Sequence, residues 1–158
     1  MTARPTLVLG IGNVLMGDEG VGTHAVAALE ADDWPPDVQL VDGGTGGFHL
    51  LSYLLDHDRI VMIDATMDGQ PPGTVSILRP KYASDFPRSL TAHDIGLRDL
   101  VEAAALLGPL PAIDLVTVSI AEIRPMVTEL SPAVNAALAD VKRVVRDLMR
   151  REAAASHA

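Results

Sequence analysis

Short apolar runs alternate with helical patterns along most of the chain. Five runs have the length and composition of strands: Thr6–Ile11, Val38–Val41, Ile60–Ile63, Thr74–Leu78 and Ile113–Ser119. Patterns of helical period lie between them and predict helices over Val21–Glu30, Gly47–Leu55 and Ile95–Leu107. Strands that alternate with helices favour a sheet covered on both faces. We therefore predict a single α/β domain, a three-layer sandwich whose twisted, mostly parallel sheet has about five strands.

The last helix has the clearest pattern. Ser131 is predicted to cap it, with Pro132 at the first helical position. An apolar stripe of helical period follows, made of Val134, Leu138, Val141, Val145 and Leu148. The basic residues of this helix gather toward its C-terminal end, where cations favour the helix dipole, and we interpret them as a solvated face. The predicted domain spans residues 1–151, and we expect the tail at 152–158 to fray.

Composition narrows the classes of function. The 158 residues include 12 Lys and Arg against 21 Asp and Glu, a formal charge of −9, and no cysteine. Such a charge opposes nucleic acid and anionic membranes, so we expect neither as a partner. The lack of cysteine excludes a thiol nucleophile, thiolate zinc sites and disulfides. The longest apolar runs are strand-sized and no signal-like block precedes the first strand, so we expect a cytoplasmic protein. We also expect a monomer.

A glycine-rich turn with two adjacent acids follows the first predicted strand. A nucleotide-binding enzyme would explain the Gly10-x-Gly12 pattern in this turn. However, Leu15 stands where the third glycine of a dinucleotide fingerprint belongs, and Asp18 and Glu19 would repel a phosphate. Two carboxylates suit a metal or a cationic group better. A nucleotide-binding enzyme therefore stays as an alternative that a cofactor-binding titration tests.

Three carboxylates follow the first three predicted strands. Glu19 lies in the loop after the first strand, Asp42 directly after the second and Asp64 directly after the third. If these strands are parallel neighbours, all three side chains face one crevice at the carboxyl edge of the sheet. His93 stands at the start of the next predicted helix, a place that favours a neutral imidazole free to coordinate a metal. Such oxygen and nitrogen donors suit zinc, manganese, iron or nickel and leave positions open for water or substrate.

Each of these residues also has an ordinary structural interpretation. A lone loop acid is more often a helix cap, Asp64 could be a turn former that bonds its own backbone, and His93 could be a capping histidine. Their joint placement favours a functional role. Asp42 is interpreted as holding the next loop through backbone N–H bonds rather than as a direct ligand. We hypothesise that a substrate peptide lies against that loop, which consists of Gly43, Gly44, Thr45, Gly46 and Gly47.

Several motifs occur along the chain in a characteristic order. They are Gly10-Ile11-Gly12-Asn13-Val14-Leu15, Gly17-Asp18-Glu19-Gly20-Val21-Gly22, Asp42-Gly43-Gly44-Thr45-Gly46-Gly47, Ile63-Asp64-Ala65, His93-Asp94-Ile95-Gly96-Leu97 and Leu130-Ser131-Pro132. In this combination the chain resembles the hydrogenase maturation proteases. The resemblance implies an endopeptidase that removes a C-terminal extension from the precursor of a [NiFe]-hydrogenase large subunit after nickel insertion. It also implies that Glu19, Asp64 and His93 bind the metal, either nickel recognised in the substrate or another divalent ion at the same site.

The residue inventory limits the chemistry of such an enzyme. The chain has no cysteine, no Gly-x-Ser-x-Gly elbow and no His-Glu-x-x-His motif. The remaining route is metal-assisted or carboxylate-assisted attack of water on a peptide bond, with Asp18 or Asp42 as the hypothesised proton carrier. A non-catalytic assembly chaperone for a metalloprotein is a further alternative, and it would leave the mass of the precursor unchanged.

Overall fold

A five-stranded sheet forms the centre of the molecule, for which the computed structural model describes residues 5–45, 47–87, 90 and 96–156. The strand order is β2-β1-β3-β5-β4. Four of the strands run parallel, and β4 is antiparallel to β5. The strands are β1 (Thr6–Gly10), β2 (Val38–Asp42), β3 (Arg59–Thr66), β4 (Val75–Leu78) and β5 (Ala112–Ser119). This architecture confirms the predicted α/β domain with a mostly parallel sheet.

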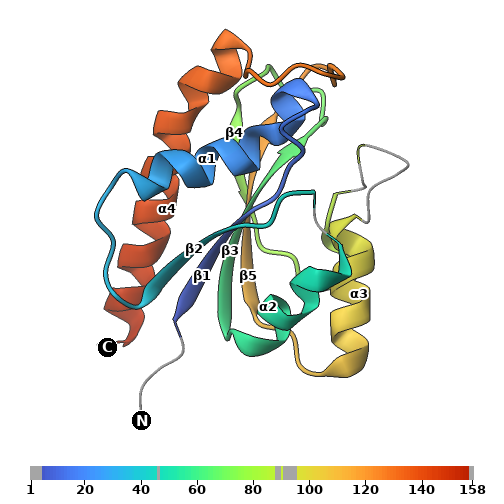
Figure 1. Cartoon of the computed structure of the whole chain (residues 1–158). Coiled ribbons are helices and arrows are strands. Elements are labelled where there is room, and N and C mark those ends of the chain that lie inside the picture. The colour runs from blue at the N-terminus through green and yellow to red at the C-terminus, as the bar shows by residue number, and fades with distance from the viewer. Residues whose placement is uncertain (1–4, 46, 88–89, 91–95, 157–158) are drawn as a thin grey trace.

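Helices cover both faces of the sheet, which is strongly twisted (Figure 1). One face is covered by α1 (Val21–Glu30) and α4 (Pro132–Ser156). The other is covered by α2 (Leu51–Asp56) and α3 (Leu97–Leu107). Short 3-10 turns, η1 (Gly17–Gly20), η2 (Phe48–Leu50) and η3 (Ala83–Asp85), precede or follow these elements. In the described part of the chain, no helix combines the length and apolar character that crossing a membrane requires.

The sheet is buried on both sides, which explains why its central strands consist of nearly continuous apolar runs. In β3 the side chains alternate between the two faces, so Val61 and Ile63 pack with α1 and α4. Ile60 and Met62 pack with α2 and α3 instead. Two hydrophobic cores result, one on each side of the sheet.

Some boundaries of strands and helices differ from the predicted ones. Strand β3 extends to Thr66, since its last residues pair with β5 without needing apolar side chains. The helix predicted from Gly47 begins with the 3-10 turn η2, and the helix predicted from Ile95 is described from Leu97 onward. Helix α4 continues to Ser156, within the segment expected to fray.

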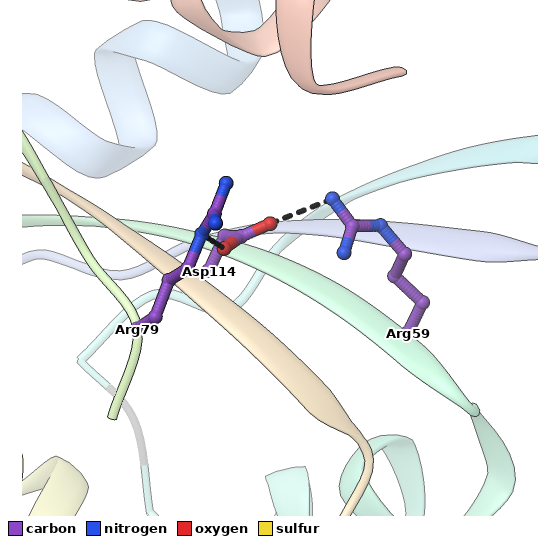
Figure 2. Close-up of polar contacts among 3 residues, drawn as sticks. All are labelled: Arg59, Arg79 and Asp114. Carbon is purple, nitrogen blue, oxygen red and sulfur yellow. Dashed lines mark hydrogen bonds and ion pairs between the residues drawn. The ribbon is translucent and has the colours of Figure 1, made fainter. Parts of the chain in front are cut away.

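A buried aspartate ties the strands together at the amino end of the sheet (Figure 2). Asp114 of β5 accepts a hydrogen bond from Arg59 Nη2 at 2.6 Å and another from Arg79 Nε at 3.0 Å. Its side chain is only 5% exposed, whereas that of Arg79 is 65% exposed. A carboxylate at this depth needs charged donors. The three residues therefore join β3, β5 and the end of β4, away from the loops at the carboxyl end.

Candidate functional site

The loop between β1 and α1 places two acids at the carboxyl end of the sheet. It folds into η1, which packs against β3. Asp18 is 9% exposed and Glu19 8% exposed. The backbone N–H of Asn13 donates to Glu19 Oε2 at 2.6 Å. Because a charge-assisted bond of this length orients its acceptor, the Glu19 carboxylate is held in a defined position beside β3.

Five backbone amides of this loop already donate to other groups of the protein. A phosphate cradle needs several such N–H groups directed at its ligand. In the segment 12–17, five backbone N–H groups donate to protein oxygens at distances of 2.6 to 3.0 Å. They belong to Gly12, Asn13, Leu15, Met16 and Gly17. This arrangement, together with the adjacent acids, disfavours the nucleotide-binding alternative.

Asp42 is the last residue of β2, not the residue after it, and its side chain lies toward α1. Its Oδ1 atom accepts hydrogen bonds from Thr23 Oγ1 and from the backbone N–H of Gly44, both at 2.9 Å. The second bond is the one that the loop-holding interpretation of Asp42 predicts. The bond from Thr23 additionally fixes the loop to α1. Asp42 therefore connects the start of α1 with the loop that begins at Gly43.

Asp64 lies within β3 rather than directly after it. The backbone N–H of Ala65 donates to its Oδ1 at 2.8 Å, which is the self-bonding contact of its structural interpretation. Strand alternation places Asp64 on the face of Ile60 and Met62, next to Thr117 of β5. Asp42 is in register with Gly10 and lies on the opposite face. Asp42 and Asp64 thus lie on opposite faces of the sheet at its carboxyl end, and the expectation that they face one crevice stays a prediction.

The third predicted ligand, His93, lies outside the described residues, as does Gly46 of the predicted substrate loop. Among the residues that the structure describes, no group of three or more His, Asp and Glu side chains is arranged to hold a metal ion. The structure brings η1, which carries Glu19, against β3, which carries Asp64. The ligand set of Glu19, Asp64 and His93 therefore stays a prediction.

The predicted substrate loop is tied to β1 at its first residues. The N–H of Gly43 donates to Gly10 O, and Gly44 O accepts from the N–H of Gly12, both at 2.7 Å. Thr45 is exposed, and Gly47 is partly exposed. The described part of the loop is thus fixed at its start and accessible at Thr45 and Gly47. A peptide-binding role needs both properties, and it stays a prediction.

Sequence reasoning did not find the contact between the first loop and α4. Ser131 donates its backbone N–H to Asp18 Oδ1 and its hydroxyl to Asp18 Oδ2, each at 2.7 Å. Ser131 occupies the predicted cap position before Pro132, and its carbonyl accepts the N–H of Asn135 at 2.8 Å, while its hydroxyl is directed at Asp18. A groove of about 590 Å³ lies beside this contact and is lined in part by Arg124 and Leu130. The only signal in the sequence was the Leu130-Ser131-Pro132 motif, which gives no partner.

Comparison with known proteins decides the family. Residues 23–147 match the model of the hydrogenase maturation protease family, HycI. The chain belongs to the hydrogenase maturation protease family. Its fold matches the hydrogenase maturating endopeptidase HybD from Escherichia coli with a TM-score of 0.84 at 33% sequence identity, over 94% of both chains. Family membership and fold therefore agree with the resemblance found in the motifs.

Curated relatives support the same membership. The hydrogenase 2 maturation protease of Escherichia coli is 38% identical over 108 residues, which are 66% of this chain and 66% of that protein. HoxM of Cupriavidus necator, a hydrogenase expression/formation protein, is 32% identical over 92% of this chain and 74% of its own length. HupD of Rhizobium leguminosarum is 36% identical over 66% of this chain. The chain spans about half the length of this HupD and of several other curated relatives.

Proposed function

We propose that this chain is an endopeptidase that removes the C-terminal extension of a [NiFe]-hydrogenase large-subunit precursor after nickel insertion. The observation that carries the proposal is the match to the maturating endopeptidase HybD, which extends over 94% of both chains at 33% identity. A relative named as a hydrogenase 2 maturation protease supports it at 38% identity. The hydrogenase precursor is accordingly the proposed partner.

Glu19, Asp64 and His93 are the proposed ligands of the metal. The donor chemistry supports this assignment, because a mostly buried carboxylate from η1 and a partly buried carboxylate from β3 come from elements that pack together. Carboxylate and imidazole donors suit nickel and other divalent ions. Nickel would arrive as part of the substrate, and another divalent ion at the same position is the second option. A bound divalent ion would polarise the carbonyl of the scissile peptide bond.

The chain's own residues would orient the precursor for attack by water. Asp42 holds the start of the loop at residues 43–47 through its bond to the N–H of Gly44. The C-terminal segment of the precursor would lie along the exposed part of this loop, where Thr45 is accessible. Glu19 is oriented by the N–H of Asn13. Holding the peptide and the ligands in fixed positions is the main contribution to rate that the described residues offer.

Processing of a purified precursor tests the proposal directly. Wild-type protein is incubated with nickel-loaded and with metal-free large-subunit precursor, and the mass of each precursor is measured over time. We expect loss of the C-terminal peptide from the nickel-loaded form only, because the ion adds ligation between enzyme and substrate only when it is present. Equal cleavage of both forms would contradict nickel recognition but not proteolysis. Cleavage of neither form would contradict the endopeptidase and favour the assembly chaperone.

Single substitutions test the ligand set. Glu19→Ala, Asp64→Ala and His93→Ala should each abolish processing while the circular-dichroism spectrum keeps the signal of the folded protein, since residues of a functional site are selected for activity rather than for stability. Glu102→Ala is the matched control, because Glu102 is an exposed acid on α3 that is not among the predicted site residues, and it should process normally. Full activity in any of the three site variants would remove that residue from the ligand set.

A further inference from the structure

Asp18 is buried at the point where two distant parts of the chain meet. It is 9% exposed, and both of its carboxylate oxygens accept hydrogen bonds from Ser131, at 2.7 Å each. The two residues are 113 positions apart, and Ser131 immediately precedes α4. A buried carboxylate is costly unless it is well bonded, and bonds from an N–H and a hydroxyl to a charged acceptor are stronger than neutral ones. The contact is therefore a strong link between η1 and the start of α4.

The turn that carries Asp18 depends on outside contacts for its position. Turn η1 is a single 3-10 turn of four residues without a side-chain cap, and such short turns are weakly held by their own bonds. On its N-terminal side, the N–H of Gly17 donates to Val127 O at 2.7 Å, and Met16 forms a parallel bridge with Val127. Turn η1 also packs against β3 and continues directly into α1, and the bonds of Asp18 to Ser131 are a further anchor, directly next to Glu19.

We propose that Asp18 is a positioning residue, which fixes Glu19 in the site by binding Ser131, and is not the proton carrier. The inference rests on the proposed function, because Glu19 matters here as a proposed metal ligand. A proton carrier has to reach the attacking water or the peptide, whereas both oxygens of Asp18 are directed at Ser131. Loss of the link would let η1 shift, and a shift of roughly 1 Å at a catalytic group lowers rates by about 10²-fold.

Three variants separate positioning from proton transfer. Asp18→Ala removes both acceptors, whereas Asp18→Asn keeps a carbonyl acceptor for the Ser131 N–H and places an amide donor opposite its hydroxyl. Ser131→Ala removes one of the two bonds. Cleavage of nickel-loaded precursor should fall by at least about tenfold in kcat in Asp18→Ala, fall less in Ser131→Ala, and be largely restored in Asp18→Asn with an unchanged pH profile. An Asp18→Asn protein as inactive as Asp18→Ala, beside a normal Ser131→Ala protein, would overturn the proposal in favour of proton transfer.

Hydrogen exchange provides a test that does not depend on proteolysis. The N–H of Asn13 reports the position of Glu19 because it donates to Glu19 Oε2. Asp18→Ala should speed exchange at Asn13 and at Ser131, whereas Asp18→Asn should keep both protected. Unchanged protection of Asn13 in Asp18→Ala would overturn the proposal.

If wild type fails to cleave the precursor, the proposed function fails, but hydrogen exchange still decides whether Asp18 positions Glu19. If Asp18→Ala does not fold, Ser131→Ala and Asp18→Asn decide the outcome by the same two readouts.

Discussion

Replacing Gly22 by alanine should push α1 away from the sheet and destabilise the protein. A Cβ atom at Gly22 would lie 2.1 Å from Ile11 O and 2.5 Å from Ile63 O. Non-bonded heavy atoms normally approach to about 3.5 Å, so a relative movement of roughly 1 Å is required. Both oxygens belong to the backbone, and Ile63 O already accepts the N–H of Ile11. The atoms that block the methyl group are therefore held by the sheet and cannot turn aside as a side chain would.

The size of the effect follows from two opposing terms. Forcing an extra methyl group into a packed site costs about 1–3 kcal/mol, and the rigid backbone neighbours place Gly22→Ala at the upper end. Alanine in place of glycine within a helix returns up to about 1 kcal/mol. The expected loss in free energy of unfolding is therefore about 2 kcal/mol, which for a domain of this size lowers Tm by about 6 °C.

Urea and thermal unfolding measure this loss. Gly108→Ala is the matched control, because Gly108 follows α3 in extended backbone with φ of 173° and a Cβ there would meet only Leu55 Cδ2, at 3.8 Å. It should change stability by less than about 0.5 kcal/mol. Gly22→Ala should lower the urea midpoint with an unchanged m-value. A Gly22→Ala protein as stable as wild type, or a control that is equally destabilised, would refute the close-approach argument.

Two further predictions concern charged groups. Asp114→Ala should lower the free energy of unfolding, measured in urea, by about 3 kcal/mol, since it removes the buried acceptor that Arg59 and Arg79 share. Asp140→Ala removes only an exposed pair with Arg143 and should lower it by less than about 1 kcal/mol. Equal costs would contradict this. A hydrogen bond from Arg146, with help from Lys142, lowers the pKa of Asp32 below its ordinary 3.8. The ionised Asp32 therefore stabilises the fold fully above pH 3.8, and this stabilisation is lost as the pH falls through the lowered pKa. The Tm of wild type should therefore exceed that of Asp32→Asn at neutral pH and converge with it in acid; a constant difference would contradict this.

The sequence determined the α/β class and the order of its elements, because periodicity and turn residues act within a few positions of the chain. It also identified the strand ends as the place of the candidate site, and its motifs indicated the family that the comparisons show. Glu19, Asp42 and Asp64 could be named as candidates for the same reason, since an acid near the end of an apolar strand is visible without any structure.

The tertiary structure decided how these residues are used. Whether Asp64 belongs to β3 depends on pairing with β5, and the registers of β2 and β3 with β1 place Asp42 and Asp64 on opposite faces of the sheet. The bond between Asp18 and Ser131 joins residues 113 positions apart. No local pattern specifies such a partner, because it depends on where helices and loops pack after the sheet has formed. The sequence thus fixes which side chains are available, and packing across the chain selects the contacts that orient them.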